Sequence, residues 1–337
     1  MATRLFAAPS PHIHGGEKTR RIMLDVILAL VPALAVSTYV MGWRVLLVTG
    51  VAVAGCVLFE FLFGLMMGRR TTIGDLSAIV TGMLLAFNLP VGIPWWIVLI
   101  GAVVAIGVGK MTFGGLGCNP FNPALTGRIF LLIAYPVQMT DWTMISPNWI
   151  PKEVADTLSG STMLAGVKHS TYDAAGNIVL GNMNLDSINF MGMFGGYMNG
   201  SLGEIASLAL ILGGLYLLWR KVISWHIPVA VLGTMAVFAL CVALGIGGGS
   251  LCYELPLFHI LAGGALLGAI FMATDYSTSP MTHKGMLIYG VGIGLLTMII
   301  RLWGAYPEGM SFAIFIMNAA TPLINKYFRP KRFGVKK

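Results

Sequence analysis

Charged residues are scarce in this sequence of 337 residues. Only 10% of them are Asp, Glu, Lys or Arg, and 57% are hydrophobic, whereas soluble domains contain roughly 25% charged residues. A soluble protein of this length could not bury so much apolar surface. Apolar runs of about 20 residues, the length of a helix that crosses a hydrocarbon core of ~30 Å, recur along the chain. We therefore predict an all-α polytopic membrane protein embedded in a lipid bilayer.

The sequence also lacks the short motifs of several enzyme classes. It contains no Gly-rich phosphate-binding loop, no H-E-x-x-H motif and no nucleophile elbow, which argues against self-contained hydrolysis and ATP-driven pumping. The few cysteines have no spacing typical of metal ligands, so we predict no metal site and assign them to apolar packing. They are Cys56, Cys118, Cys241 and Cys252.

Ten apolar segments predict about ten membrane helices, of which the third and the fifth are short. They cover residues 22–41, 45–66, 75–90, 94–110, 123–137, 202–219, 226–246, 256–274, 285–302 and 310–325. With the N-terminus in the cytoplasm, 17 of the 21 Lys and Arg residues, Lys110 and Arg128 among them, fall on the cytoplasmic side. The positive-inside rule favours this orientation. It also explains the net charge of +8 without a nucleic-acid partner.

This topology divides the chain into two membrane halves. The parts are a five-helix half at residues 1–137, an extracytoplasmic loop at 138–201, a second five-helix half at 202–325 and a basic cytoplasmic tail at 326–337. An odd number of crossings reverses the second half, so the halves are predicted to be inverted repeats, and residues 81–87 resemble residues 263–269. Sites in such folds lie near the midplane where the halves meet.

Two Asn-Pro pairs stand just before the fifth predicted helix. They are Asn119-Pro120 and Asn122-Pro123, and a proline forces the residue before it into extended backbone. Two interpretations remain open. The asparagines either cap the fifth helix in a structural turn, or their amides bind a planar polar ligand such as an isoalloxazine ring.

Carboxylates within membrane segments are costly and often functional. Glu60 lies deep in the second predicted helix, and Asp275 lies at the cytoplasmic end of the eighth. We interpret both as candidates for an ion pathway. The alternatives are that Glu60 is the partner of a buried polar group and that Asp275 is a cap or turn residue.

The extracytoplasmic loop contains an unusual small and polar motif. Residues 156–162 read D-x-x-S-G-S-T and end at Thr162. This motif resembles the site at which a flavin transferase esterifies a threonine with the phosphate of FMN. Together with the G-x-N-P-F-N-P-A run at 117–124, Arg69-Arg70-Thr71-Thr72 and Met272-Ala273-Thr274-Asp275, it makes the chain similar to the D subunits of the Rnf electron-transport complexes, which are related to the B subunit of the sodium-pumping NADH:quinone reductase.

The resemblance implies a flavoprotein subunit of a redox-driven ion pump in the bacterial cytoplasmic (inner) membrane. Thr162 would carry covalent FMN within the motif that Ser159, Gly160 and Ser161 complete, with Ser161 standing where the family has alanine. Asn119 and Asn122 would lie near a second, non-covalent flavin, riboflavin. The complex would pass electrons between ferredoxin and NAD and move Na⁺ or H⁺.

The same resemblance implies partners. These are the other membrane, flavin and iron–sulfur subunits of the complex and a flavin transferase for maturation. This chain is then one subunit of an oxidoreductase with no complete active site of its own. Two rival interpretations carry no flavin: a small-solute channel or transporter built from inverted repeats, and a purely structural subunit that scaffolds redox partners.

Overall fold

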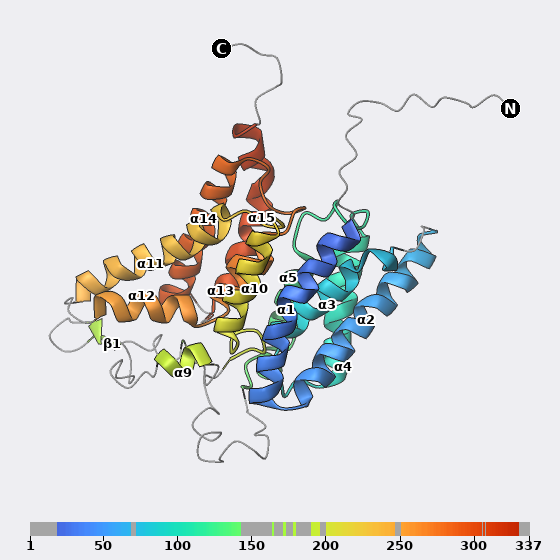
Figure 1. Cartoon of the computed structure of the whole chain (residues 1–337), viewed down its shortest axis with the longest axis horizontal. Helices are drawn as coiled ribbons and strands as arrows, with labels where there is room; N and C mark the ends of the chain where they lie inside the picture. The colour runs from blue at the N-terminus through green and yellow to red at the C-terminus, as the bar shows by residue number, and fades with distance from the viewer. Residues whose placement is uncertain are drawn as a thin grey trace, which may run out of the picture.

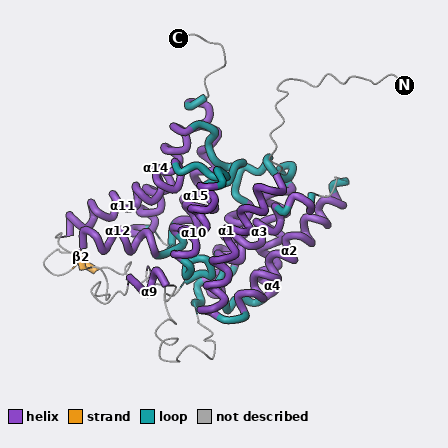
Figure 2. The backbone as a smooth tube through the Cα atoms, in the orientation of Figure 1, coloured by secondary structure: helices purple, strands orange, loops and turns teal. Residues whose placement is uncertain are grey.

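The computed structural model describes most of the two membrane halves. The described residues are 19–68, 72–142, 164, 171–172, 178–179, 190–195, 200–246, 251–304, 306 and 308–329. Helices dominate this part of the chain, as the purple tube of Figure 2 makes clear. The described loop residues add the short helix α9 (Phe190–Gly195) and two antiparallel strands, β1 (Thr171–Tyr172) and β2 (Ile178–Val179).

The first half runs from α1 to α6, blue to green in Figure 1. Its elements are α1 (Thr19–Met41), α2 (Arg44–Met66), the 3₁₀ turn η1 (Ile73–Asp75), α3 (Ser77–Phe87), α4 (Trp95–Val103), the π-helix η2 (Val104–Met111), α5 (Pro123–Ala134) and α6 (Pro136–Met139). The second half, yellow to red, consists of α10 (Ser207–Trp219), α11 (His226–Ile246), α12 (Leu251–Leu261), α13 (Ala265–Leu267), the π-helix η4 (Gly268–Met272), α14 (His283–Trp303) and α15 (Met310–Tyr327).

Each of the ten predicted segments contains helix in the structure, and segment 226–246 coincides with α11 at both ends. Among the described residues, α1, α2, α11 and α14 are long and apolar enough to cross a membrane, and a bent helix pair adds a fifth candidate. The third and fifth predicted segments form helices of only 11 and 12 residues, α3 and α5. The chain is therefore a multi-pass membrane protein in which short helices lie between long ones.

The eighth predicted segment, 256–274, contains helix on both sides of a break. The chain bends by 65° between Leu261 and Ala265. Gly263 and Gly264 adopt positive φ angles of 70° and 65° at the bend, a conformation that glycine accepts without strain. Arg301 of α14 satisfies the carbonyls freed by the break, because its guanidinium donates to the oxygens of Ala262 and Gly263 at 2.8 and 3.0 Å.

The two halves pack directly against each other. Helix α1 contacts α10, and α5 contacts α15, as the adjoining blue and yellow helices of Figure 1 illustrate. The first contact is close because Gly213 of α10 lies against the carbonyl oxygen of Ala29, where any Cβ would overlap it. Small residues commonly permit such close helix approaches in membranes.

Three basic residues within the predicted membrane segments are buried inside the protein. Lys110, Arg128 and Arg301 are only 1%, 5% and 3% exposed. Lys110 pairs with Glu60, and Arg128 pairs with Glu308. They are internal charges rather than loop charges, so the count of basic residues in favour of the proposed orientation must omit all three.

Candidate functional site

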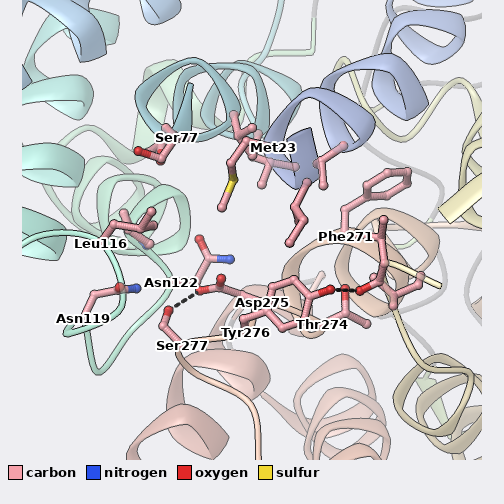
Figure 3. A pocket seen from close by; sticks show the side chains of 18 of the residues that line it. Met23, Ser77, Leu116, Asn119, Asn122, Phe271, Thr274, Asp275, Tyr276 and Ser277 are labelled. Carbon is pink, nitrogen blue, oxygen red and sulfur yellow. Dashed lines mark hydrogen bonds between the residues drawn. The ribbon is translucent and has the colours of Figure 1, made fainter. Parts of the chain in front are cut away.

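A cavity opens between the two halves at the end of the molecule where α1 begins and α10 ends (Figure 3). It measures about 760 Å³ including its open mouth. We call it the first cavity. Its polar lining comprises Ser77, Thr81, Lys110, Asn119, Asn122, Thr274, Asp275, Tyr276 and Ser277, and its apolar lining includes Met23, Val26, Leu84, Leu116 and Phe271. A cavity of this size, mostly apolar with a few polar groups, is typical of cofactor sites.

Asn122 joins the two halves at the floor of this cavity. Its Oδ1 accepts a hydrogen bond of 3.0 Å from the backbone of Ala124, which caps α5, and Pro123 occupies the first helical position. Its Nδ2 donates to the carbonyl of Met272 in the second half at 3.2 Å. The interpretation of Asn122 as a helix cap is thus confirmed, and the same amide also lines the cavity.

Asn119 differs from Asn122 because part of its amide is unused. Its Nδ2 donates to the carbonyl of Phe121 at 3.0 Å. Its Oδ1 is buried and has no hydrogen-bond partner among the described residues. A buried oxygen without a partner costs about 1–3 kcal/mol, so the geometry favours a ligand in the first cavity that donates to Asn119.

Asp275 lies in the turn after the broken helix, on the side of the first cavity facing Asn122 (Figure 3). Its Oδ2 accepts hydrogen bonds from the hydroxyls of Ser277 at 2.9 Å and Thr278 at 3.4 Å. Burial raises the pKa of the Asp275 carboxyl above its ordinary value, although the hydrogen bonds from Ser277 oppose that rise. Asp275 therefore stabilises the turn by hydrogen bonds, as one of the two sequence interpretations predicted, and it also places a carboxylate at the first cavity.

Glu60 does not line the first cavity but lies behind its wall. Its Oε2 is 2.8 Å from Nζ of Lys110, and both side chains are only 1% exposed. The hydroxyl of Thr72 donates to its other oxygen, and Lys110 also donates to Ser77 at 2.7 Å. Because Lys110 and Ser77 reach the cavity, Glu60 is coupled to it through one ion pair.

The sequence analysis missed Lys110 as a site residue. The signal available was a lysine at the end of the apolar run 94–110, but its carboxylate partner lies fifty residues earlier in the chain. The structure thus brings Asn119, Asn122 and Asp275 together, with Glu60 one contact removed. Their roles in binding or ion passage stay predictions.

The D-x-x-S-G-S-T motif, with Ser159, Gly160, Ser161 and Thr162, lies outside the described residues. Leu164 is the described residue nearest to it in the sequence. Leu164 is only 4% exposed and packs against Gly263, leaving no room for a Cβ there. Leu164 is therefore packed at the break in the second half.

The chain is similar to known proteins over nearly its whole length. The model of the family described as NQR2, RnfD, RnfE matches residues 6–334. The D subunit of the Na⁺-translocating ferredoxin:NAD⁺ oxidoreductase complex of Acetobacterium woodii is 45% identical over 333 residues, which are 99% of this chain and 96% of that protein. Its counterpart in the proton-translocating complex of Clostridium ljungdahlii is 40% identical, covering 97% of this chain and 96% of that protein. The D subunit of the ion-translocating oxidoreductase complex of Escherichia coli is 37% identical, covering 98% of both chains.

Proposed function

Because the chain belongs to the NQR2, RnfD, RnfE family, we propose that it is the D-type membrane subunit of an ion-translocating ferredoxin:NAD⁺ oxidoreductase. Similarity along the full length to subunits of such complexes supports this function. The observation in the structure that carries it is the first cavity between the halves, with its buried amides. As a subunit of a larger complex, the chain works with further membrane, flavin and iron–sulfur subunits.

The first cavity fits a non-covalent flavin such as riboflavin. Its polar lining offers the free oxygen of Asn119 as an acceptor and Lys110 as a donor, while Phe271 and Leu84 supply apolar walls. An isoalloxazine ring carries both donors and acceptors on one edge and an apolar face. When bound, a flavin supplies one- and two-electron redox chemistry, and the protein tunes it by hydrogen bonds and nearby charge. In this cavity, Asn119 would orient the ring.

Covalent FMN on Thr162 belongs to the same proposal. The D-x-x-S-G-S-T motif supports it, and a flavin transferase would supply the FMN. This proposal places the loop on the outer side of the bacterial inner membrane. The Lys and Arg residues near both ends of the chain favour the same orientation, because the positive-inside rule puts those ends in the cytoplasm. Helix α1 begins and α15 ends at the same end of the molecule in Figure 1, as two cytoplasmic termini would require.

An inverted repeat of two five-helix halves is supported by a shared local geometry. Helix α3 follows Leu76 and α13 follows Gly264, and these N-cap residues have left-handed φ angles of 62° and 65°. A buried cation donates a hydrogen bond beside each of these N-caps: Lys110 donates to the hydroxyl of Ser77, and Arg301 donates to the carbonyl of Gly263. This correspondence pairs Leu76 with Gly264, a register different from the sequence pairing of residues 81–87 with 263–269.

Ion passage by acidic residues is the remaining part of the proposal. Glu60→Gln and Asp275→Asn are expected to lower Na⁺ or H⁺ transport more than they lower flavin content. The comparison requires the assembled complex in vesicles, with electron transfer and ion uptake measured on the same preparation. Normal pumping by both variants would refute the acidic pathway.

In-gel flavin fluorescence after denaturing electrophoresis tests the covalent flavin most directly. The wild-type chain and Thr162→Ala are each expressed with a flavin transferase, and Ser161→Ala serves as the matched control because it restores the family's alanine. We expect fluorescent bands for the wild type and for the control and a dark band for Thr162→Ala. A dark wild-type band beside a glowing flavinylated standard would refute the proposal and favour the transporter without a cofactor.

A further inference from the structure

A groove lies on the surface of the second half, where α10 ends and α11 begins. It measures about 700 Å³ including its open mouth, and we call it the lysine groove. Its main lining residues are Lys221, Val222, Ile223, Ser224, Ile227 and Met286. The groove and the first cavity share a wall, in which the hydroxyl of Tyr276 donates to the carbonyl of Val222. The lysine groove is therefore a site separate from the proposed flavin cavity.

Two exposed tryptophans place the lysine groove at the membrane surface. Trp219 is the last residue of α10, Trp225 directly precedes α11, and both side chains are exposed. Tryptophans gather where the hydrocarbon core of a membrane meets the lipid headgroups. The groove residues 221–224 stand between these two tryptophans in the sequence, so the groove opens at the level of the headgroups.

The lining of the lysine groove combines apolar side chains with a cation. Val222, Ile227 and Met286 supply apolar surface, whereas Lys221 is exposed and carries a positive charge. Among the described residues, no carboxylate lines the groove to balance that charge. Such a surface complements an amphipathic anion, with its phosphate beside the ammonium group and an acyl chain against the apolar side chains.

Lys221 occupies a backbone position that usually belongs to glycine. Its φ angle is 57°, in the left-handed region. Its N–H donates to the carbonyl of Leu218 at 3.0 Å, and the N–H of Val222 donates to the carbonyl of Leu217 at 2.9 Å, which is the hydrogen-bond pair of a Schellman motif. Left-handed backbone is costly for a residue with a Cβ but not for glycine. A role for the ammonium group accounts for a lysine at this position.

A stack of three rings holds the helices around the groove together. Trp225 lies against His226 with the ring centroids 4.1 Å apart, and His226 lies against His283 of α14 with the centroids 4.3 Å apart. The hydroxyl of Ser224 also donates to the sulfur of Met286 at 3.3 Å. These contacts join the start of α11 to the start of α14, so the groove is formed before any ligand binds. A preformed site loses less entropy on binding.

From these observations we propose that the lysine groove binds one anionic phospholipid. The lipid phosphate pairs with the ammonium group of Lys221, and an acyl chain lies against Ile227 and Met286. A zwitterionic lipid carries a positive group next to its phosphate, so it is bound more weakly. In the proposed orientation this end of the chain faces the cytoplasm, whose leaflet is rich in anionic lipids. The proposal does not depend on any flavin.

Thermal unfolding of the full chain in micelles of a neutral detergent tests this site. Phosphatidylglycerol, phosphatidylcholine and inorganic phosphate are added separately, because a ligand that binds only the folded chain raises its melting temperature. Lys221→Gly removes the charge and relieves the left-handed backbone, whereas Lys221→Arg keeps the charge. The matched control is Lys326→Met, which removes an exposed lysine of α15 that does not line the groove.

We expect phosphatidylglycerol to raise the melting temperature of the wild type more than phosphatidylcholine does. Lys221→Arg and Lys326→Met should keep that difference. Lys221→Gly should need about fivefold more phosphatidylglycerol for the same rise, which is the contribution of one lysine near an anionic membrane surface. Its melting temperature without lipid should be at least that of the wild type, because glycine suits the Schellman position. A lysine with a merely structural role would instead make that melting temperature fall.

Equal responses of the wild type and Lys221→Gly to phosphatidylglycerol would overturn the site, as would equal rises of the wild type with the two lipids. A rise with inorganic phosphate that matches the rise with phosphatidylglycerol would replace the lipid by a free anion. Failed assembly of the complex by Lys221→Gly, with an unchanged lipid response, would assign the lysine to an acidic protein partner and overturn the proposal as well. Lys221→Asn replaces Lys221→Gly if the glycine variant does not fold, because asparagine also accepts left-handed backbone.

Discussion

Replacing Lys110 by methionine is expected to destabilise the protein strongly. Lys110 and Glu60 form an ion pair at 2.8 Å in which both side chains are 1% exposed. The methionine fills a similar volume but leaves the Glu60 carboxylate buried with only Thr72 as a described hydrogen-bond donor. An uncompensated buried charge is the main cost of such a substitution.

The magnitude follows from this burial. Removing one partner of a buried ion pair costs about 3–5 kcal/mol, whereas replacing both partners with uncharged residues of similar shape is often close to neutral. Glu60→Gln alone leaves Lys110 with its hydrogen bond to Ser77 but without a counter-charge, so it is expected to be costly as well. The double variant Glu60→Gln/Lys110→Met should lose clearly less stability than the sum of the two single variants.

The assay is a double-mutant cycle on the free energy of unfolding, measured by denaturing-detergent titration of the purified chain. We expect a coupling energy between Glu60 and Lys110 of about 3 kcal/mol or more, because each single variant leaves one buried charge without a counter-charge and the double variant leaves none. Lys326→Met is the control, because Lys326 is exposed on α15 and a surface change stays within about 0.5 kcal/mol. Additive single variants, within about 0.5 kcal/mol, would refute the buried ion pair.

Two further predictions concern helix contact and pH. Gly213→Ala places a Cβ on the carbonyl oxygen of Ala29 and should cost about 1–3 kcal/mol of stability by overpacking. The control Gly233→Ala, with no atom within 4 Å of the new Cβ, should be neutral or slightly stabilising. The melting temperatures of both variants in detergent test this prediction, and equal losses would contradict the close contact of α1 with α10. Burial raises the pKa of Asp275 in the folded state, so the folded protein binds more protons than the unfolded one, and stability should fall as the pH rises above the ordinary value of 3.8. Asp275→Asn should flatten that part of the curve of melting temperature against pH, and an unchanged curve would count against the shift.

The length of the apolar runs was enough to find the helices but not their interruptions. Helix α11 coincides with its predicted segment, because a continuous apolar run begins there after Ser224-Trp225 and ends before three consecutive glycines, 247–249. The bend at Gly263 and Gly264 could not be seen in the same way, since a glycine pair is equally common at close helix contacts. What makes it a break is Arg301, which accommodates the freed carbonyls from another helix.

The site shows the same division between local and distant information. The Asn-Pro pairs predicted a polar turn before α5, and Asn122 caps that helix. The internal position of Lys110 and Arg128 was missed because it depends on Glu60 and Glu308, which are far away in the sequence. A lysine or arginine is assigned to a membrane surface by default, and only the folded structure reveals its counter-charge.

Helix α5 has an electrical consequence, because it borders the first cavity near its start and, further along, a second cavity lined by Arg128, Tyr306 and Glu308. Arg128 is six positions after Asn122, so about 9 Å of helix separates the two linings, against a hydrocarbon core of ~30 Å. Where water enters both cavities from opposite sides of the membrane, most of the membrane voltage falls across the insulating layer between them. Carrying one charge through the full voltage takes about 2.3 kcal/mol per 100 mV. An electron that passes along this short helix would then cross most of the membrane voltage, and α5 is the place where a leak of ions or protons would dissipate that voltage.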